Sequence, residues 1–415
     1  MPDRLCTMLS GEYLHIPGEV LTIIDILEKN GHEAFIVGGC VRDMLLGLEP
    51  KDFDICTSAL PEQVLQLFPK CIPTGIKHGT VTVLVNDTPF EVTTYRIESG
   101  YTDFRHPDNV MFSDSLTEDL KRRDFTINAM AYHPARGVVD PFDGIRDLKA
   151  KVIRTVGNPY ERFGEDALRM LRAIRFQAVY GFSIENKTFS AIKALSNNIS
   201  VISRERILEE LNRILLSSYP ETFINLLDSK LLSHILPVPL PATADLRILT
   251  RLPEDIYTRW AAFLFLAGVN NPDDIRIVCT DLKMSNRLKD EILMISKLLG
   301  VKFPKNSYTM RLILSETGTD SFARALSILK ILYPESEDLK ETEKDFNRII
   351  SEKHCISLSG LAVKGSDLLS AGFKPGKNIG TLLNVLFTCV LQNPDLNRKE
   401  LLMLFAGIIK NKFGL

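Results

Sequence analysis

The chain has 415 residues, of which 45% are hydrophobic and 25% are charged, and its formal net charge is −2. This length is too great for one compact core and predicts two to four domains, while the composition is that of a globular protein. A net charge so close to zero excludes binding of nucleic acid through overall charge, so any such contact has to come from local basic patches.

The cysteines indicate the compartment. The seven of them are scattered, with no C-x-x-C pair and no Cys/His cluster, which favours a reducing cytoplasm and argues against structural zinc. The first 20 residues contain no apolar segment typical of a signal peptide, and no apolar run reaches membrane-spanning length. We therefore expect a cytoplasmic protein without a membrane partner.

Residues 17–31 predict an amphipathic helix closed by Gly31, and the strongest functional signal follows it. The apolar run 35–37 predicts a buried strand, ended by Gly38 and Gly39, whose lack of Cβ atoms lets a phosphate approach the backbone. Residues 40–46 predict a short helix, whose free N–H groups would face an anion. Arg42 lies in its first turn, where a guanidinium can grip a second phosphate oxygen.

Residues 52–55, Asp-Phe-Asp-Ile, predict a strand with both aspartates on one face. At ~3.3 Å rise per residue their Cα atoms lie about 6.6 Å apart, so Asp52 and Asp54 can converge on a pair of Mg²⁺ ions. Alone, an Asp-x-Asp is usually a solvated edge, and a Gly-Gly before a helix is usually a tight turn. Together, a phosphate-binding turn and a metal-binding pair suit nucleotidyl transfer from a triphosphate. Neither a Rossmann fingerprint nor a Walker P-loop is present.

Residues 61–68 predict another helix, and residues 80–85 and 90–95 predict two strands of a hairpin. Glu91 lies on the second strand. Two interpretations of it stay open: a third carboxylate for the metal pair, or a polar residue on an exposed strand face. Residues 98–118 are polar and interrupted by Pro107, as in a surface loop.

The pattern Gly38-Gly39-x-x-Arg42-Asp43 followed by Asp52-x-Asp54 resembles the polymerase-β-like nucleotidyltransferases, specifically the family of class II tRNA nucleotidyltransferases and bacterial poly(A) polymerases. The resemblance implies an α+β fold: an N-terminal nucleotidyltransferase head, with a mixed sheet and helices, followed by an all-helical neck, body and tail. The expected boundaries are 1–150 for the catalytic head, 151–222 for the nucleotide-selecting neck, 223–305 for the body and 306–415 for the tRNA-binding tail.

Three further stretches extend this resemblance. Within residues 121–130, the run Arg-Arg-Asp-Phe-Thr-Ile-Asn-Ala at 122–129 matches a family motif nearly letter for letter. The match implies that Arg123 contacts the triphosphate, although three consecutive basic residues are usually a solvated turn. Asp-Pro-Phe-Asp-Gly at 140–144 resembles the next motif, in which many members have glycine where Asp143 stands, and we expect little consequence. In the family, a loop corresponding to 98–118 helps to change the nucleotide preference, and we expect Asp103 and Arg105 to contact the selecting residues.

Residues 164–182 lack a helix breaker until Gly181 and predict one amphipathic helix. Four charged residues recur every three positions on it and form a neighbouring stripe: Asp166, Arg169, Arg172 and Arg175. One interpretation is a solvated helix face with an Asp–Arg pair at i,i+3. The other is a nucleotide-binding surface.

The second interpretation follows from hydrogen-bonding patterns. An aspartate accepts from N4 of cytosine or N6 of adenine, and an arginine donates to O2/N3 of cytosine or N1 of adenine. Uracil and guanine present the opposite pattern, so one Asp–Arg pair selects C and A without a template. The sequence Glu165-Asp166-x-x-Arg169 matches the family's nucleotide-selecting motif, and Arg172 and Arg175 match further arginines that hold the nucleotide.

The remaining chain is predicted to be helical. Residues 202–207 start a helix with Ser203 as a candidate N-cap and resemble the motif that closes the family's neck. Three prolines between 237 and 241 mark a domain edge. Residues 151–216 carry eleven basic against seven acidic residues, and residues 356–415 carry seven against three, so these segments are the expected RNA-facing surfaces.

The resemblance therefore implies an enzyme that adds C, C and A to the 3′ end of tRNA, with Mg²⁺ as cofactor, tRNA, CTP and ATP as partners, and no DNA. Asp52 and Asp54 are the expected catalytic and metal-binding residues, and the expected nucleotide-binding residues are Gly39, Arg42, Arg123, Asp166, Arg169, Arg172 and Arg175. The alternatives are a partial CC-adding or A-adding enzyme, a poly(A) polymerase, and a non-catalytic RNA-binding protein. The intact aspartates count against the last, and the absence of a long basic C-terminus counts against a poly(A) polymerase.

Overall fold

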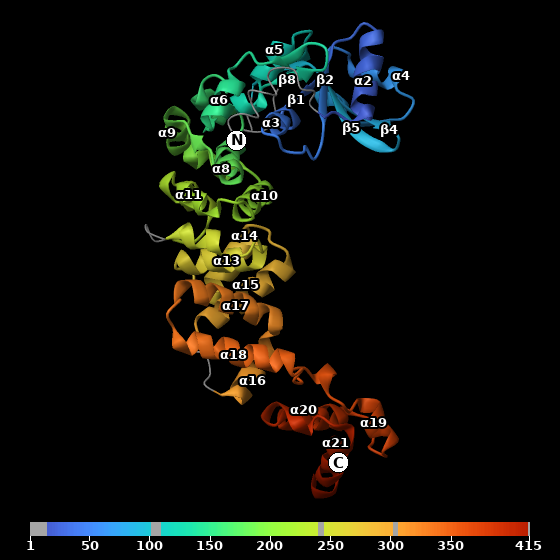
Figure 1. Ribbon diagram of the computed structural model, residues 1–415, viewed down its shortest axis with the longest axis vertical. Coiled ribbons are helices and arrows are strands. Elements are labelled where there is room, and N and C mark those ends of the chain that lie inside the picture. The colour runs from blue at the N-terminus through green and yellow to red at the C-terminus, as the bar shows by residue number, and fades with distance from the viewer. Residues whose placement is uncertain (1–14, 101–108, 240–244, 302–305, 414–415) are drawn as a thin grey trace. The chain divides into compact units, whose positions relative to one another are not determined.

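A computed structural model describes residues 15–100, 109–239, 245–301 and 306–413 (Figure 1). The chain divides into two compact units. The first comprises Met1–Leu246 with Thr280–Lys283, and the second comprises Arg247–Cys279 with Met284–Leu415. Within the described ranges, every helix is too short or too polar to span a lipid bilayer.

The first unit is built on a seven-stranded sheet with the order β3-β4-β5-β2-β1-β8-β9. Its strands are β1 (Ala34–Val37), β2 (Asp54–Thr57), β3 (Cys71–Gly75), β4 (Thr80–Val85), β5 (Thr88–Thr94), β8 (Ala131–His133) and β9 (Gly137–Val139). Strands β2 and β5 are parallel and the other neighbours are antiparallel, so the sheet is mixed, as expected.

Helices of the first 150 residues pack around this sheet, with α2 and α4 in contact beside it (Figure 1). They are α2 (Gly18–Lys29), α3 (Gly39–Leu45), α4 (Pro61–Leu67), α5 (Leu116–Lys121) and α6 (Gly144–Ala150). A core cluster joins the central strands to α5, with Phe35, Cys56, Tyr95 and Leu120 among its buried members. This core anchors β1 and β2, from whose ends the site residues project.

The predicted elements before residue 97 are largely confirmed. The helix at 17–31 is α2, followed by Gly31 with φ +83°, and the hairpin turns at Asn86 and Asp87, both with positive φ. The strand predicted at 52–55 begins only at Asp54. Asp52 lies in the connection before β2, where it is exposed, so strand alternation is not what brings the two aspartates to one site.

The prediction that 98–118 is a loop is wrong for most of the described part. Strand β6 (Arg96–Ser99) pairs antiparallel with β7 (Asn109–Phe112), and α5 follows. The charges of β6 are paired rather than solvated: the Glu98 side chain is 7% exposed and contacts two arginines. Asp103 and Arg105 lie outside the described residues.

The single helix predicted over 164–182 is also wrong, because two helices meet there. Helix α7 (Pro159–Glu165) ends one residue before Asp166, and α8 (Leu168–Tyr180) begins two residues after it. Asp166 has extended backbone angles, φ −138° and ψ 106°, and its side chain accepts the N–H of Leu168 at 3.0 Å. Such local capping by aspartate competes with helix continuation. The predicted stop at Gly181, with φ +67°, is confirmed.

After α8 the first unit is mainly helical. Its remaining helices are α9 (Asn186–Leu195), α10 (Arg204–Leu215), α11 (Ile224–Asp228) and α12 (Leu231–Ile235). Before them, a short parallel pair, β10 (Val152–Ile153) and β11 (Ser183–Ile184), joins the two ends of the segment that contains α7 and α8. Ser203 occupies the N-cap position of α10 but makes no side-chain capping bond.

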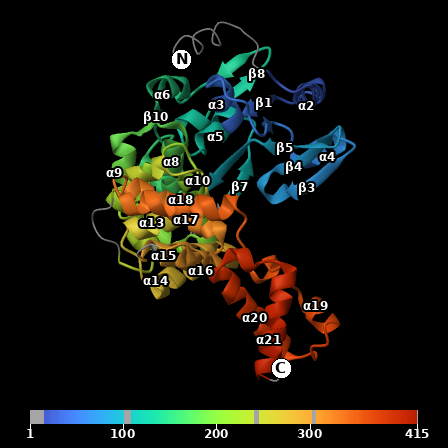
Figure 2. The same ribbon diagram turned by 60° about the horizontal axis from the view of Figure 1, so that its bottom comes forward.

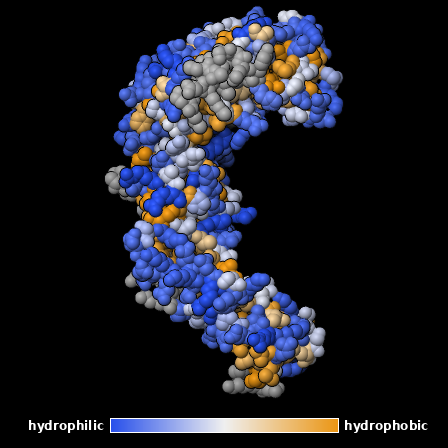
Figure 3. Space-filling model, in the orientation of Figure 1, coloured by the Kyte–Doolittle hydropathy of each residue, from blue (hydrophilic) through white to orange (hydrophobic). Residues whose placement is uncertain are grey.

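The second unit is helical in its described residues (Figure 2). Its helices are α13 (Ile256–Leu266), α14 (Pro272–Asp281), α15 (Asn286–Leu299), α16 (Ser307–Thr317), α17 (Thr319–Leu332), α18 (Glu337–Ser351), α19 (Gly365–Ser370), α20 (Lys377–Gln392) and α21 (Lys399–Phe413). Helices α13, α15 and α17 pack in succession, and α19, α20 and α21 enclose a separate apolar cluster. Hydrophobic side chains also gather on the surface over the last helices, where Leu404 and Ile408 are exposed (Figure 3).

Candidate active site

A cavity of about 470 Å³ in the first unit is lined by every site residue predicted from the sequence. Those residues are Gly39, Arg42, Asp52, Asp54, Arg123, Asp166, Arg169, Arg172 and Arg175, and the other lining residues are Arg122, Asp124, Asn128, Leu168, Phe176 and Arg206. The lining comes from five separate parts of the sequence, so the cavity exists only because the sheet and the helices α8 and α10 bring them together.

The turn after β1 depends on glycine for two reasons. Gly38 has φ +82° and ψ −129°, a conformation that is costly for any residue with a Cβ. In addition, a Cβ at Gly38 would lie 2.5 Å from Nη1 of Arg123. The following helix α3 has only seven residues, so the positive charge around this turn comes chiefly from arginine side chains.

Arg42 is held in place by several contacts. Its Nη1 donates to Oδ1 of Asn128 at 2.5 Å, and its Nε donates to Asp43 at 2.9 Å. Its guanidinium lies over the rings of Phe176 and Tyr180, 5.1 and 4.8 Å from their centroids. The Tyr180 hydroxyl donates to Asp43 at 2.8 Å. This arrangement fixes the guanidinium at the cavity wall with little freedom to move.

Asp52 and Asp54 have a different environment. Within the described residues neither carboxylate forms an ion pair or a side-chain hydrogen bond. Burial raises the pKa of the Asp54 carboxyl to about 6, Arg123 opposes that rise, and the negative charges of Asp52 and Glu91 add to it. The two carboxylates therefore form a locally negative position, beside the arginines that line the rest of the cavity, which a divalent cation would neutralise.

Glu91 lies beside Asp54 in the sheet, because the two residues are register partners of β5 and β2. Together with both aspartates it lines a second cavity, whose described lining residues include no arginine. In the part of the chain that the structure describes, no three His, Cys, Asp or Glu side chains form a group that could hold a metal by themselves. A Mg²⁺ ion at Asp52 and Asp54 would then take its other ligands from phosphate and water, as this ion commonly does.

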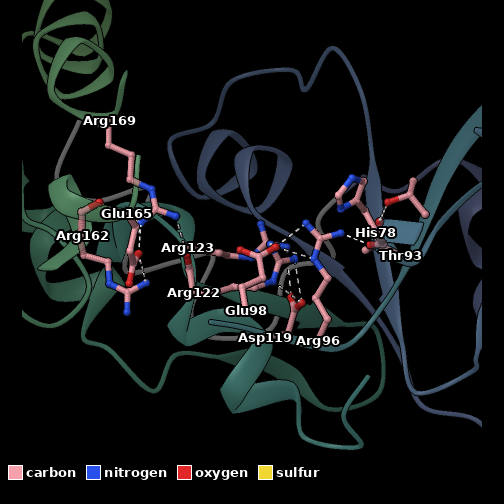
Figure 4. A network of polar contacts seen from close by, with 11 residues as sticks. His78, Thr93, Arg96, Glu98, Asp119, Arg122, Arg123, Arg162, Glu165 and Arg169 are labelled. Atoms are coloured by element: carbon pink, nitrogen blue, oxygen red, sulfur yellow. Dashed lines mark hydrogen bonds and ion pairs between the residues drawn. The ribbon is translucent and has the colours of Figure 1, made fainter. Parts of the chain in front are cut away.

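The basic run at 121–123 is not the solvated turn that its composition allows. Asp119 is fully buried and contacts Arg122 at 2.8 Å and Arg123 at 3.6 Å. Arg122 also contacts Glu98 at 3.3 Å, and its carbonyl accepts from Nη2 of Arg169 at 3.1 Å. Figure 4 shows these polar contacts, which extend from Arg96 on β6 towards the start of α8.

Asp124 links this segment to α8. Its Oδ2 accepts from Nη2 and Nε of Arg172 at 2.7 and 2.8 Å, and its Oδ1 accepts from the Asn128 side chain at 3.0 Å. Burial tends to raise the pKa of Asp124, but Arg172, Asn128 and Arg169 outweigh it and hold the pKa below its ordinary value. Asp124 is thus an ionised, buried support for Arg172.

The interpretation of Asp166 and Arg169 as a solvated i,i+3 pair is wrong. Their side chains are only 17% and 11% exposed, and each has a different partner. Arg169 donates to Glu165 at 2.5 Å, whereas Oδ2 of Asp166 accepts from Nη2 of Arg206 at 3.1 Å. Both residues nevertheless line the cavity, as the nucleotide-binding interpretation requires.

Arg175 lines the cavity and also contacts other side chains of the protein. Its Nε lies 2.9 Å from Glu210 on α10, and its guanidinium lies 4.3 Å from the centre of the Phe176 ring. Burial lowers the pKa of Arg175 to about 10, while Glu210 opposes the change. The pair therefore packs α8 against α10.

Asp143 stands where many family members have glycine, and the turn at 140–144 is nevertheless formed. Asp143 has φ +61° and forms an exposed ion pair with Arg146. Asp140 accepts the backbone N–H groups of Gly144 and Ile145 at 2.7 and 2.9 Å. A Cβ at Gly144 would lie 2.4 Å from the carbonyl of Thr126, so glycine is needed at 144.

Sequence reasoning missed Asp124, Asn128 and Arg206 as lining residues. All three lie in stretches that resemble family motifs, at 121–130 and 202–207. Only their position in those stretches could have identified them, because the sequence spacing does not predict that Arg206 lies near Asp166.

Comparison with known proteins agrees with this geometry. Residues 34–154 match the family model "Poly A polymerase head domain", residues 181–242 match "Probable RNA and SrmB- binding site of polymerase A", and residues 253–406 match a model for "tRNA nucleotidyltransferase domain 2". The chain is 37% identical over 409 residues to the CCA-adding enzyme of Streptococcus mutans, covering 94% of this chain and 98% of that enzyme. It is 38% identical over 392 residues to that of Pediococcus pentosaceus, covering 92% and 96%.

Solved structures give the same picture. The Bacillus stearothermophilus CCA-adding enzyme in complex with CTP has a TM-score of 0.78 and 32% identity, covering 95% of this chain and 97% of that one. The Thermotoga maritima CCA-adding enzyme complexed with tRNA_CCA has a TM-score of 0.67 at 21% identity, covering 98% of both chains, which shows a shared fold.

Proposed function

The chain belongs to the family of CCA-adding enzymes, and from this membership we infer that it adds C, C and A in turn to the 3′ end of tRNA. The substrates are CTP and ATP, no nucleic-acid template is used, and pyrophosphate is released. The observation that carries the proposal for this chain's own residues is one cavity, in which the carboxylates of Asp52 and Asp54 lie together with the side chains expected to select the base and bind the phosphates.

We propose that Asp52 and Asp54 hold Mg²⁺, because carboxylate oxygens are ligands that this ion prefers and because the pair carries unneutralised negative charge. When bound, the metal would favour ionisation of the RNA 3′-hydroxyl and neutralise charge on the triphosphate. Glu91 is a further candidate carboxylate at the neighbouring strand position.

The remaining residues would contact different parts of the nucleotide. Arg42 and Arg123, beside the Gly38–Gly39 turn, would donate to phosphate oxygens, since guanidinium groups match phosphate geometry. Asp166 and Arg169 would read the base edge as acceptor and donor. Arg172, held by Asp124, and Arg175, held by Glu210, would complete the nucleotide-binding wall.

We further propose the division into a head at 1–150, a neck at 151–222, a body at 223–305 and a tail at 306–415, of which the last binds tRNA. We also propose a cytoplasmic location, supported by the absence of disulfides among the described cysteines and by a tRNA substrate.

The test uses purified protein and tRNA transcripts that end in the discriminator base, C, CC or CCA. With Mg²⁺ and each NTP alone, we expect CTP incorporation on the first two transcripts, ATP incorporation on the third and none on the fourth. Incorporation of only C or only A identifies a partial enzyme, and continued A addition identifies a poly(A) polymerase. A lack of incorporation on every transcript contradicts the proposed function.

A further inference from the structure

Arg206 contacts the residue that is expected to read the base. Its Nη2 donates to Oδ2 of Asp166 at 3.1 Å, and it lines the same cavity. It comes from α10, 40 residues beyond Asp166 in the sequence. The contact therefore arises from the packing of α10 against α8.

Asp166 needs such support because, in the described part of the chain, Oδ2 has no other hydrogen-bond donor. Its backbone is extended and lies between two helices, so no helix fixes the direction of its side chain. Oδ1 accepts the N–H of Leu168. Arg169 gives no support, because its guanidinium is bonded to Glu165 and to the backbone carbonyls of Arg162 and Arg122.

Recognition of an exocyclic amine depends on where the accepting lone pair lies. A carboxylate held by one bond can rotate about its Cβ–Cγ bond and offer acceptors in several directions, whereas two bonds fix its plane. Each oxygen of Asp166 has one protein donor and keeps further capacity to accept from a base.

We propose that Arg206 is a specificity-determining positioning residue, which orients Asp166 so that C and A are accepted and U and G are rejected. This inference rests on the proposed function. Nη1 of Arg206 is buried and has no hydrogen-bond partner among the described residues. It therefore remains available to donate a hydrogen bond to a nucleotide bound in the cavity.

Arg204 provides a matched control on the same helix. Its side chain is 27% exposed, against 26% for Arg206, and it forms an ion pair of 3.2 Å with Asp281, against 3.1 Å for Arg206 with Asp166. Arg204 does not line the cavity. Substitution of either arginine removes one comparable ion pair, but only Arg206 contacts Asp166.

The experiment measures kcat/KM for all four NTPs, with CTP and UTP on tRNA ending in C, and with ATP and GTP on tRNA ending in CC. The proteins are wild type, Arg206→Gln, Arg206→Lys, Arg204→Gln, Asp166→Ala and the double variant Asp166→Ala/Arg206→Gln. A good bidentate contact gives roughly 5- to 150-fold discrimination. We expect Arg206→Gln to reduce the C/U and A/G ratios by at least about fivefold, Arg206→Lys to restore part of them, and Arg204→Gln to leave them unchanged.

The double variant tests whether Arg206 acts through Asp166. We expect its C/U and A/G ratios to equal those of Asp166→Ala, because an unsupported acceptor and a missing one fail alike. Unchanged C/U and A/G ratios in Arg206→Gln overturn the proposal. An equal loss of kcat/KM for all four NTPs also overturns it, because it would mean that Arg206 contacts the triphosphate rather than orienting Asp166. The proposal is also overturned if the effects of the two single substitutions on the C/U and A/G ratios simply multiply in the double variant. If wild type incorporates no nucleotide, the proposed function fails instead, so the two failures are distinct.

Discussion

Two groups of aspartates in the first unit differ in what surrounds them. Asp119, Asp124 and Asp166 each have an arginine partner supplied by the fold. Asp52 and Asp54 lie in the same region without such a partner among the described residues, and burial with neighbouring negative charge raises the pKa of Asp54. Carboxylates that the protein neutralises itself serve to position arginines or to be positioned by them. Carboxylates left with surplus charge are suited to a cation from outside.

The two groups should therefore respond differently to substitution. Removing a paired aspartate leaves an arginine uncompensated, which costs folding stability or alters the shape of the cavity. Removing an unpaired aspartate costs the folded protein little, but it removes a ligand on which the reaction depends. The following predictions test this difference.

The largest effect is expected for the unpaired group. Asp52→Ala or Asp54→Ala should lower nucleotide incorporation by more than on the order of 10³-fold, because metal-ion stabilisation of developing charge supplies several kcal/mol. The midpoint of thermal unfolding and the affinity for tRNA should stay near the wild-type values. Both are measured beside Glu62→Ala, which removes an exposed carboxylate on α4. Substantial residual turnover in the Asp52/Asp54 double variant would remove both residues from the metal site.

Asp124→Asn should produce the opposite result, a loss of stability. The change keeps the size of the side chain but leaves Arg172 without its counter-charge. Breaking a buried pair costs about 3–5 kcal/mol. The Arg172 side chain is 34% exposed, so water partly compensates its charge. We therefore expect the free energy of unfolding, measured with urea, to fall by the lower end of this range, about 3 kcal/mol.

The pH dependence of the same variant gives an independent check. The pKa of Asp124 is lowered in the folded state, so its contribution to stability is present above the unfolded-state pKa of about 3.9 and is lost as the pH falls below it. Wild-type stability should therefore fall more steeply with acidification than that of Asp124→Asn. Parallel stability curves for the two proteins would mean that folding does not lower the pKa of Asp124.

Asp166→Asn should change selectivity by about 1–3 kcal/mol, the range for a good bidentate base contact. The amide keeps one acceptor for the N–H of Leu168, but it presents a donor where the carboxylate presented an acceptor. That donor suits O4 of uracil and O6 of guanine. We expect UTP and GTP to gain relative to CTP and ATP in kcat/KM. Unchanged ratios would make Asp166 a structural residue, like Asp124.

Tyr180→Phe is expected to have the smallest effect. It removes the hydroxyl that donates to Asp43 but keeps the ring under the Arg42 guanidinium. A net loss of about 1 kcal/mol in unfolding free energy is typical for one hydrogen bond, together with a modest rise in the KM for nucleotide. Tyr160→Phe, at an exposed site on α7, is the control. Equal behaviour of the two variants would mean that Asp43 positions Arg42 without Tyr180.

The sequence by itself determined the strand–turn–helix at 34–45, because a buried apolar run, two glycines and a short helix are local features. It also singled out residues that the structure brings together around one cavity, since each belongs to a short stretch that resembles a family motif. Periodicity predicted individual helices and strands, because these depend on patterns within ten or twenty residues. The mixed sheet of the head was expected only from the resemblance to the family, since its strand order joins distant segments.

Only the tertiary structure decided which charges meet. The pairs Asp124–Arg172 and Asp166–Arg206 join residues 48 and 40 positions apart, and no local pattern encodes their contact. The same limit explains the error at 164–182, where spacing predicted an Asp166–Arg169 pair on one helix. The capping of Leu168 by Asp166 breaks that helix, and the support of Asp166 by α10 gives the freed carboxylate its orientation. Asp166 pairs with the distant Arg206 rather than with the nearby Arg169 because α8 packs against α10. This packing forms only when the whole unit folds.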